Sequence, residues 1–186
     1  MIEQIIDGGL YRFEIELDED AESPREWSNL SHFYTWSSRY NSPDDNPYER
    51  YRDLVEELGY DPVDLRHRHK GVGFYVEKYE HGDVMYYLND GGALYDDWDS
   101  CLVGVIYATR EEICKWFGCK YITKKVWEKV VNQFNSELRC YAQWVNGYVN
   151  KVICYDKDGE IVSVVGGVYG DEDDIESDIR AGYYGP

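Results

Sequence analysis

The alternation of apolar and polar residues predicts a strand near the start of the chain. From Tyr11 to Leu17, aromatic or aliphatic residues alternate with charged ones, which is the period-2 pattern of a strand with one buried face. Residues 18–24 contain the acids, serine and proline that are typical of a turn. The aromatic segment 27–40 shows no clean period, and we expect a short helix with irregular packing there.

Three further strand patterns lie in the middle of the chain. Residues 72–79 and 84–88 predict two strands that form a hairpin around His81-Gly82-Asp83. Residues 89–100 predict a long acidic loop. Residues 102–107 are almost continuously apolar, which favours a central strand of the sheet.

Helical spacing and capping residues predict three helices. Residues 48–58 place apolar side chains at helical spacing before Gly59, where the helix should end. Thr109 and Glu112 fit the capping box that begins a helix, and Gly118 is its expected end. A third helix from Thr123 should have its apolar stripe at Val126, Val130, Phe134 and Leu138.

Two strands are predicted after these helices. Residues 142–155 and 160–165 flank the segment Asp156–Gly159, and its Asp-Gly pair is a strong signal for a hairpin. The acidic tail from Asp171 is expected to form one last helical turn and then to fray.

Runs of strands broken by a consecutive helix pair predict an α+β fold, with a largely antiparallel sheet on which the helix pair packs. A chain of 186 residues is long enough for one domain with a substantial core, or for two small lobes. Because the sequence contains neither a linker nor an internal repeat, we expect residues 1–186 to form a single compact domain with a short acidic tail.

The composition is that of a folded protein. The chain is 43% hydrophobic and 16% aromatic, with 19 Tyr, which is too rich in large apolar groups for a disordered acidic segment. No run approaches the roughly 20 apolar residues of a membrane helix, and the first ten residues lack the features of a signal peptide. Five cysteines without a C-x-x-C pair indicate neither a disulfide framework nor a zinc site. We therefore expect a cytoplasmic protein that contains no cofactor.

Most of the negative charge is concentrated in three short runs. The formal net charge is −18. Glu14–Glu26 contains seven acids and one arginine, Asp90–Asp99 contains four acids, and Asp171–Asp178 contains six acids. Together they contribute −16 of the total charge. Localised negative patches repel nucleic acid, bind cations or fit a basic groove on a partner, so the charge pattern points to a binding function.

Several segments, taken in their order along the chain, resemble a family of small acidic proteins that bacteriophages and other mobile elements of bacteria encode. These segments are Glu22–Leu30, Tyr79–Gly82, Trp98–Ser100, Val103–Tyr107 and Val168–Gly170. The chain departs from the family pattern at Cys101-Leu102 and at Gly166-Gly167, where an aromatic residue is usual. The resemblance implies a phage context, with anti-CRISPR or other anti-defence activity as the expected role, and it supplies no catalytic residues.

Two groups of acids are candidates for a metal site. Asp96, Asp97 and Asp99 place several carboxylates at close range, as hard cations require, and a solvated acidic loop is the alternative interpretation. Asp156 and Asp158 begin like a calcium loop but lack the later ligands of that motif. A hairpin turn explains this second pair better.

Two basic areas are candidates for phosphate contact. One is the run 66–70, in which His67 and His69 would lie on the same side of a strand without a third metal ligand. The other lies on the helix pair and contains Lys115, Lys120, Lys124, Lys125 and Lys129. Because the chain is strongly acidic, we expect both areas to pair with the protein's own acids or to face solvent, and we expect no direct binding to nucleic acid.

The sequence therefore favours a phage-encoded inhibitor, and not an enzyme, that binds a host nucleic-acid-targeting defence effector such as a Cas nuclease or a restriction enzyme. The predicted partner-binding residues are Glu14, Glu16, Asp18, Glu19, Asp20, Asp96, Asp97, Asp99, Asp171, Glu172, Asp173 and Asp174. Two alternatives remain. One is a metal-dependent hydrolase built on the Asp96, Asp97 and Asp99 cluster, and the other is a structural or assembly factor of the phage.

Overall fold

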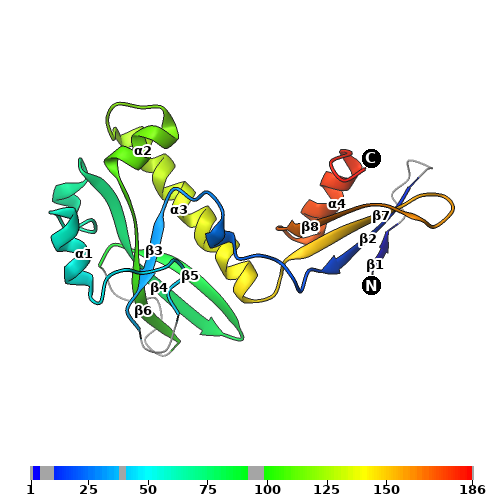
Figure 1. The fold of residues 1–186 in the computed structure, drawn as a ribbon, viewed down its shortest axis with the longest axis horizontal. Coiled ribbons are helices and arrows are strands. Elements are labelled where there is room, and N and C mark those ends of the chain that lie inside the picture. Colours follow the sequence, from blue (N-terminus) through cyan, green and yellow to red (C-terminus); the bar gives the residue numbers. More distant parts are fainter. Residues whose placement is uncertain (1, 5–10, 38–40, 92–98, 186) are drawn as a thin grey trace. The chain divides into compact units, whose positions relative to one another are not determined.

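The computed structural model describes residues 2–4, 11–37, 41–91 and 99–185, and its elements are shown in Figure 1. It contains helices and two antiparallel four-stranded sheets, so the predicted α+β class is confirmed. None of the helices among the described residues combines the length and apolar character needed to cross a bilayer. The five cysteines are free thiols, of which Cys154 is buried and Cys101 is exposed.

Contacts between residues divide the chain into two compact units. Unit 1 comprises Met1–Ser23 and Gln143–Pro186, and unit 2 comprises Pro24–Ala142. Each unit has its own sheet and its own apolar core. The sequence favours one compact domain and leaves two lobes as the alternative, and the contacts follow the two-unit arrangement.

Unit 2 contains a sheet with the strand order β3-β6-β4-β5 (Figure 1). Its strands are β3 (His32–Thr35), β4 (Gly71–His81), β5 (Asp83–Asn89) and β6 (Ser100–Thr109). The predicted hairpin joins β4 to β5 at Gly82, whose φ of 88° is a conformation that glycine adopts without a steric penalty. Strand β6 pairs with both β3 and β4, which confirms its predicted central position.

The first two helices of unit 2 end at the predicted glycines, Gly59 and Gly118, and the second also begins at its predicted capping box. The first begins at Tyr51, three residues after the predicted start at residue 48. Helix α1 (Tyr51–Leu58) ends at Gly59, which has a φ of 67°. Helix α2 (Arg110–Phe117) begins with the predicted capping box, in which the backbone N–H of Thr109 donates to Glu112 Oε2 at 2.8 Å. These bonds satisfy backbone groups that otherwise have no partner at a helix end.

Helix α3 (Lys124–Val145) is longer than the sequence predicts. A strand is expected from residue 142, whereas the helix continues to Val145 and strand β7 starts only at Asn150. The helix ends because Gly147, with a φ of 72°, lets the N–H of Tyr148 donate to the carbonyl of Gln143 at 2.8 Å. This is a Schellman end, and the glycine that forms it sits inside the apolar run that suggested a strand.

The sheet of unit 2 is covered on both faces. On one face, Phe134 of α3 and Ile113 of α2 belong to the same core cluster as Phe33, and all three are fully buried. On the other face, Leu54 of α1 packs against Tyr34 and other residues of the sheet. Neighbouring residues on a strand point to opposite faces, so Phe33 and Tyr34 belong to different clusters. Each large side chain buried in this way stabilises the fold by roughly 1.5–3 kcal/mol.

Unit 1 contains a sheet with the strand order β1-β2-β7-β8 (Figure 1). Its elements are β1 (Ile2–Gln4), β2 (Arg12–Leu17), β7 (Asn150–Tyr155), β8 (Ile161–Val168) and α4 (Glu172–Arg180). Ile175 and Ile179 of α4 pack against Phe13 and Val152 of the sheet. The segment predicted as a tail with a single helical turn is thus a nine-residue helix that covers one face of this sheet.

The predicted Asp-Gly hairpin joins β7 to β8. Asp156 Oδ1 accepts hydrogen bonds from the N–H groups of Asp158 at 2.9 Å and Glu160 at 3.0 Å. Gly159 has a φ of 84°. These bonds account for the Asp156-x-Asp158-Gly159 pattern as a turn.

The aromatic segment after residue 24 differs from its prediction. A short helix with irregular packing is expected over residues 27–40, whereas the structure has a 3-10 helix over Pro24–Glu26 and the strand β3. Strand β3 has four residues, which is too few for an alternation to be recognised. Its pairing with β6 decides its conformation.

Candidate functional site

Most of the negative charge belongs to unit 1. The residues of this unit include 17 acids and 4 bases, a formal charge of −13, whereas unit 2 has 20 acids and 15 bases, a formal charge of −5. The first acidic run as far as Glu22 and the whole third run lie in unit 1. The predicted acidic residues are therefore concentrated on a unit that contains about a third of the chain.

Two of the predicted residues, Glu14 and Glu16, lie on the open face of the unit 1 sheet. They point away from α4, because the residues that alternate with them pack beneath that helix. Glu14 accepts a hydrogen bond from the Tyr155 hydroxyl at 2.7 Å and pairs with Arg12 at 2.9 Å. Glu16 pairs with Lys151 at 3.2 Å. Much of the charge of these two acids is thus compensated within their own sheet.

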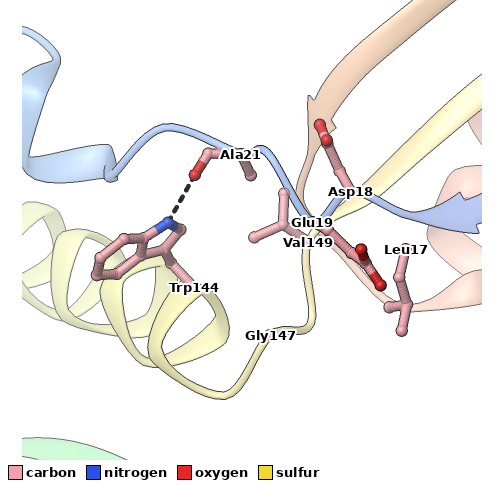
Figure 2. A pocket seen from close by; sticks show the side chains of 7 residues that line it. All are labelled: Leu17, Asp18, Glu19, Ala21, Trp144, Gly147 and Val149. Carbon is pink, nitrogen blue, oxygen red and sulfur yellow. Dashed lines mark hydrogen bonds between the residues drawn. The ribbon is translucent and has the colours of Figure 1, made fainter.

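The turn that follows β2 is fixed by three hydrogen bonds. The N–H of Asp18 donates to the carbonyl of Val149 at 2.8 Å, and the N–H of Ala21 donates to the carbonyl of Asp18 at 3.3 Å. The indole Nε1 of Trp144 donates to the carbonyl of Ala21 at 2.9 Å (Figure 2). The two acids between Asp18 and Ala21 are therefore presented on an anchored turn.

These two acids, Glu19 and Asp20, are exposed, and neither forms an ion pair within the part of the chain that the structure describes. A pocket of about 290 Å³ lies beside the turn and is lined by Leu17, Asp18, Glu19, Ala21, Trp144, Gly147 and Val149. The carboxylates of Asp18 and Glu19 point away from the indole of Trp144 (Figure 2). The volume is at the lower limit for small-molecule sites, so the acidic turn, and not the hollow, is the stronger candidate for binding.

Asp18 also contacts the last strand of the sheet. Its Oδ2 accepts a hydrogen bond from the N–H of Gly167 at 2.8 Å, and Gly167 has a φ of 66°. A Cβ added at Gly166 would lie 2.6 Å from the same oxygen. The glycine pair therefore allows β8 to approach Asp18, and this contact lies four residues before Asp171, where the third acidic run begins.

The third run forms the N-terminal turn of α4. Asp171 accepts a hydrogen bond from the N–H of Asp174 at 2.9 Å and so caps the helix. Glu172, Asp173 and Asp174 are exposed in its first turn, where the helix dipole stabilises negative charge. These acids therefore stabilise α4 and also leave a negative group of side chains in solvent.

The structure describes only part of the second acidic run, Asp90–Asp99. Asp99 belongs to unit 2, where its Oδ2 lies 3.0 Å from His81 Nδ1. Asp96 and Asp97 lie outside the described residues. Within the described residues, no three His, Cys, Asp or Glu side chains are grouped closely enough to hold a metal ion. The metal site on these three aspartates stays a prediction.

The predicted basic areas take part in contacts within unit 2. Residues Leu65–His67 form a 3-10 helix, so the prediction that His67 and His69 share one side of a strand is wrong. Arg66 pairs with Asp64 at 2.5 Å. In the second area, Lys129 Nζ lies 5.7 Å from the centroid of the Phe117 ring. Contacts within unit 2 thus occupy part of both basic areas.

A buried ionic network in unit 2 was not predicted from the sequence. Arg25 donates two hydrogen bonds of 2.7 Å to the carboxylate of Asp44 and one of 3.2 Å to Glu137. Glu137 also accepts from the N–H groups of Leu30 at 2.9 Å and Ser31 at 3.3 Å. Burial by itself would lower the pKa of Arg25, but its bonds to the two acids outweigh burial and raise that pKa. The one sign of this network in the sequence was Glu137, a glutamate beside the apolar stripe of α3.

A second pair missed by sequence reasoning is His32 with Glu112. Their Nε2 and Oε1 atoms are 2.7 Å apart, and this bond raises the pKa of His32. Burial by itself would raise the pKa of Glu112, but hydrogen bonds from His32 and Thr109 lower it to about 2. Histidine and carboxylate pairs serve as general bases in enzymes. Here Glu112 also caps the start of α2. A structural role at this helix end is therefore sufficient to explain the pair.

Comparison with known proteins gives no match to a family model, to a curated protein or to a solved structure.

Proposed function

We propose that the protein is a phage-encoded inhibitor that binds a basic, nucleic-acid-targeting defence effector of the host, such as a Cas nuclease or a restriction enzyme, through the acidic surface of unit 1. The observation that carries the proposal is the charge of −13 on unit 1, against −5 on the larger unit 2. Such an asymmetry creates a negative field on one part of the molecule and attracts a basic partner.

The charge density of unit 1 is comparable to that of duplex DNA. A compact unit of 67 residues is about 28 Å across. Duplex DNA of that length carries roughly 16 negative charges. A formal charge of −13 is close to this value, so unit 1 satisfies the electrostatic requirement for occupying a groove that otherwise binds DNA.

The acids also differ in their availability to a partner. Glu14, Glu16 and Asp99 have partners within the chain. Glu19 and Asp20 stand on a turn that is anchored at three points, and Glu172 and Asp173 stand on the first turn of α4. Groups held in place before binding lose less entropy when they bind. We therefore assign the larger share of the binding energy to these two elements.

The test has two steps. Expression of the protein in cells that carry different defence systems, scored by phage or plasmid survival, identifies the effector that it inhibits. The affinity for that effector is then measured for wild type and for the variant Glu19→Gln/Asp20→Asn/Glu172→Gln/Asp173→Asn. If each charge contributes about 0.5 kcal/mol at an exposed contact, the variant binds roughly 30-fold more weakly.

A variant of unit 2 with the same change in charge is the matched control. Asp45, Glu49, Glu57 and Glu128 are exposed acids of unit 2, and their replacement by Asn or Gln should leave the affinity within about twofold of wild type. Equal losses for both variants would show that only the total charge matters. An affinity that does not fall as salt is raised would contradict electrostatic binding.

A further inference from the structure

We infer that the exposed edge of β8 is a second contact with the same partner. This edge binds an extended segment of the partner as an added strand, and that segment has basic residues at both ends. The inference rests on the proposed function, because it names the part of unit 1 that would contact the effector. Strand addition of this kind takes its affinity from main-chain hydrogen bonds and its specificity from the alternating side chains of the added segment.

Among the described strands of its sheet, β8 is the outermost, next to β7 (Figure 1). Over Ile161–Val168 it contains no charged residue and no proline, although the chain as a whole has a net charge of −18. Edge strands are normally protected from pairing by charges, prolines or a covering element. Four of its apolar side chains are instead exposed by 37–58%: Ile161, Val162, Val164 and Val165.

The register of β8 limits the length of the segment that can be added. The pairing with β7 shifts near both ends of β8, so Ser163, Val164 and Val165 remain in continuous register. Near the second shift, Gly167 has a φ of 66° and is bonded to Asp18, and a bulge of this kind ends regular pairing. The free edge therefore accommodates an added strand of about five residues, of which three, opposite Ser163–Val165, can pair in regular register.

The charges that flank β8 determine its occupant. Asp158 and Glu160 precede the strand, Lys157 is the one base of the turn between β7 and β8, and Asp171–Asp174 follow the strand. All of these acids are exposed. A short apolar segment with Lys or Arg at each end would place its charges beside acids at both ends of β8, whereas an acidic segment would be repelled.

The same charges oppose pairing between two copies of the chain. Two β8 strands related by a two-fold axis would run antiparallel. Asp158 and Glu160 of one copy would then lie beside Asp171–Asp174 of the other. Like charges placed opposite one another are destabilising, so a basic partner segment fits this edge better than a second copy does.

The test uses a synthetic peptide, Lys-Lys-Val-Thr-Val-Thr-Val-Lys-Lys, with the full-length protein. Fluorescence anisotropy measures its affinity, and hydrogen exchange measures protection of the amides of residues 161–168. We expect saturable binding with slower exchange in β8, and no binding of the same peptide with Glu in place of Lys. The variant Val162→Lys/Val164→Lys, in which both side chains are exposed, should bind at least about tenfold more weakly.

The matched control is Tyr11→Lys/Leu17→Lys. Both residues are exposed in unit 1, they lie on the β2 side of the sheet with β7 between them and β8, and the change in charge is the same. This variant should bind the peptide within about twofold of wild type. Three results would each overturn the inference. They are unchanged hydrogen exchange in β8 when the peptide is added, equal losses of peptide affinity in the two variants, and a wild-type dimer that the β8 variant converts to a monomer.

The outcomes separate this inference from the proposed function. Binding of an effector that is unaffected by Val162→Lys/Val164→Lys leaves the proposed function intact and refutes the role of β8. Peptide binding and β8 protection without inhibition of any defence system support the edge site and refute the proposed function.

Discussion

The buried network around Glu137 provides a sharp test of the structure of unit 2. The change Glu137→Gln keeps the shape of the side chain and removes its charge. The side chains of Glu137 and Arg25 are only 4% and 3% exposed, so water cannot replace what is lost. An amide nitrogen placed at Oε2 would face Nη1 of Arg25 and the N–H of Ser31, which are both donors.

The magnitude follows from these contacts. Removing one partner of a buried ion pair costs about 3–5 kcal/mol. Arg25 keeps its two bonds to Asp44, and the remaining oxygen of residue 137 can still accept from Leu30 and Gln133. We therefore expect a loss at the lower limit of that range, about 3 kcal/mol in the free energy of unfolding. Domains of this size have a total of about 5–15 kcal/mol.

Urea unfolding, followed by tryptophan fluorescence and by hydrogen exchange of α3, measures this loss. With a slope of about 2 kcal/mol per molar urea, the midpoint should fall by about 1.5 M. The control is Glu128→Gln, because Glu128 is an exposed glutamate of the same helix, and its effect should stay within about 0.5 kcal/mol. A loss below about 1 kcal/mol for Glu137→Gln would refute the assignment of a buried, fully paired carboxylate.

Three further predictions concern the scaffold. Gly104→Ala should cost about 3 kcal/mol or more in thermal or urea unfolding, because an added Cβ would overlap the backbone carbonyl oxygen of Tyr34. Gly167→Ala should cost about 1 kcal/mol, because its φ of 66° disfavours a side chain, and exchange of the β8 amides should become faster. Because Glu112 raises the pKa of His32, the pair stabilises the fold below the pKa of an unfolded histidine and loses this effect as the pH rises through the higher folded value. Unfolding measured between about pH 6 and pH 9 should therefore show a loss of roughly 0.5 kcal/mol, a small value because both side chains are partly exposed, and Glu112→Gln should abolish that loss.

Each of these predictions has its own control. Gly185→Ala should be neutral, because nothing lies within 4 Å of its Cβ position and its backbone is not in the left-handed region. His69→Gln should leave the pH dependence unchanged, because His69 is exposed and no ion pair or hydrogen bond of its side chain is found among the described residues. A neutral Gly104→Ala would show that β3 does not approach β6 as closely as the structure has it, and a pH profile retained by Glu112→Gln would assign the titration to another group.

Local signals in the sequence determined many of the elements. The capping box of Thr109 and Glu112 and the Asp-Gly turn before β8 are each formed within a few residues. Their conformations follow from bonds between close neighbours in the chain, so they could be predicted without knowledge of the fold. The concentration of acids in three runs was likewise evident from the sequence.

Only the tertiary structure decided which segments come together and which acids remain available. Strand β7 pairs with β2, and Arg25 bonds Glu137 across 112 positions. The division into two units assigns most of the charge to the smaller one. Glu14 and Glu16 are paired in their sheet, while Glu19 and Asp20 are exposed on an anchored turn. The sequence could not distinguish them, because the availability of a charge depends on its neighbours in space, and those neighbours come from distant parts of the chain.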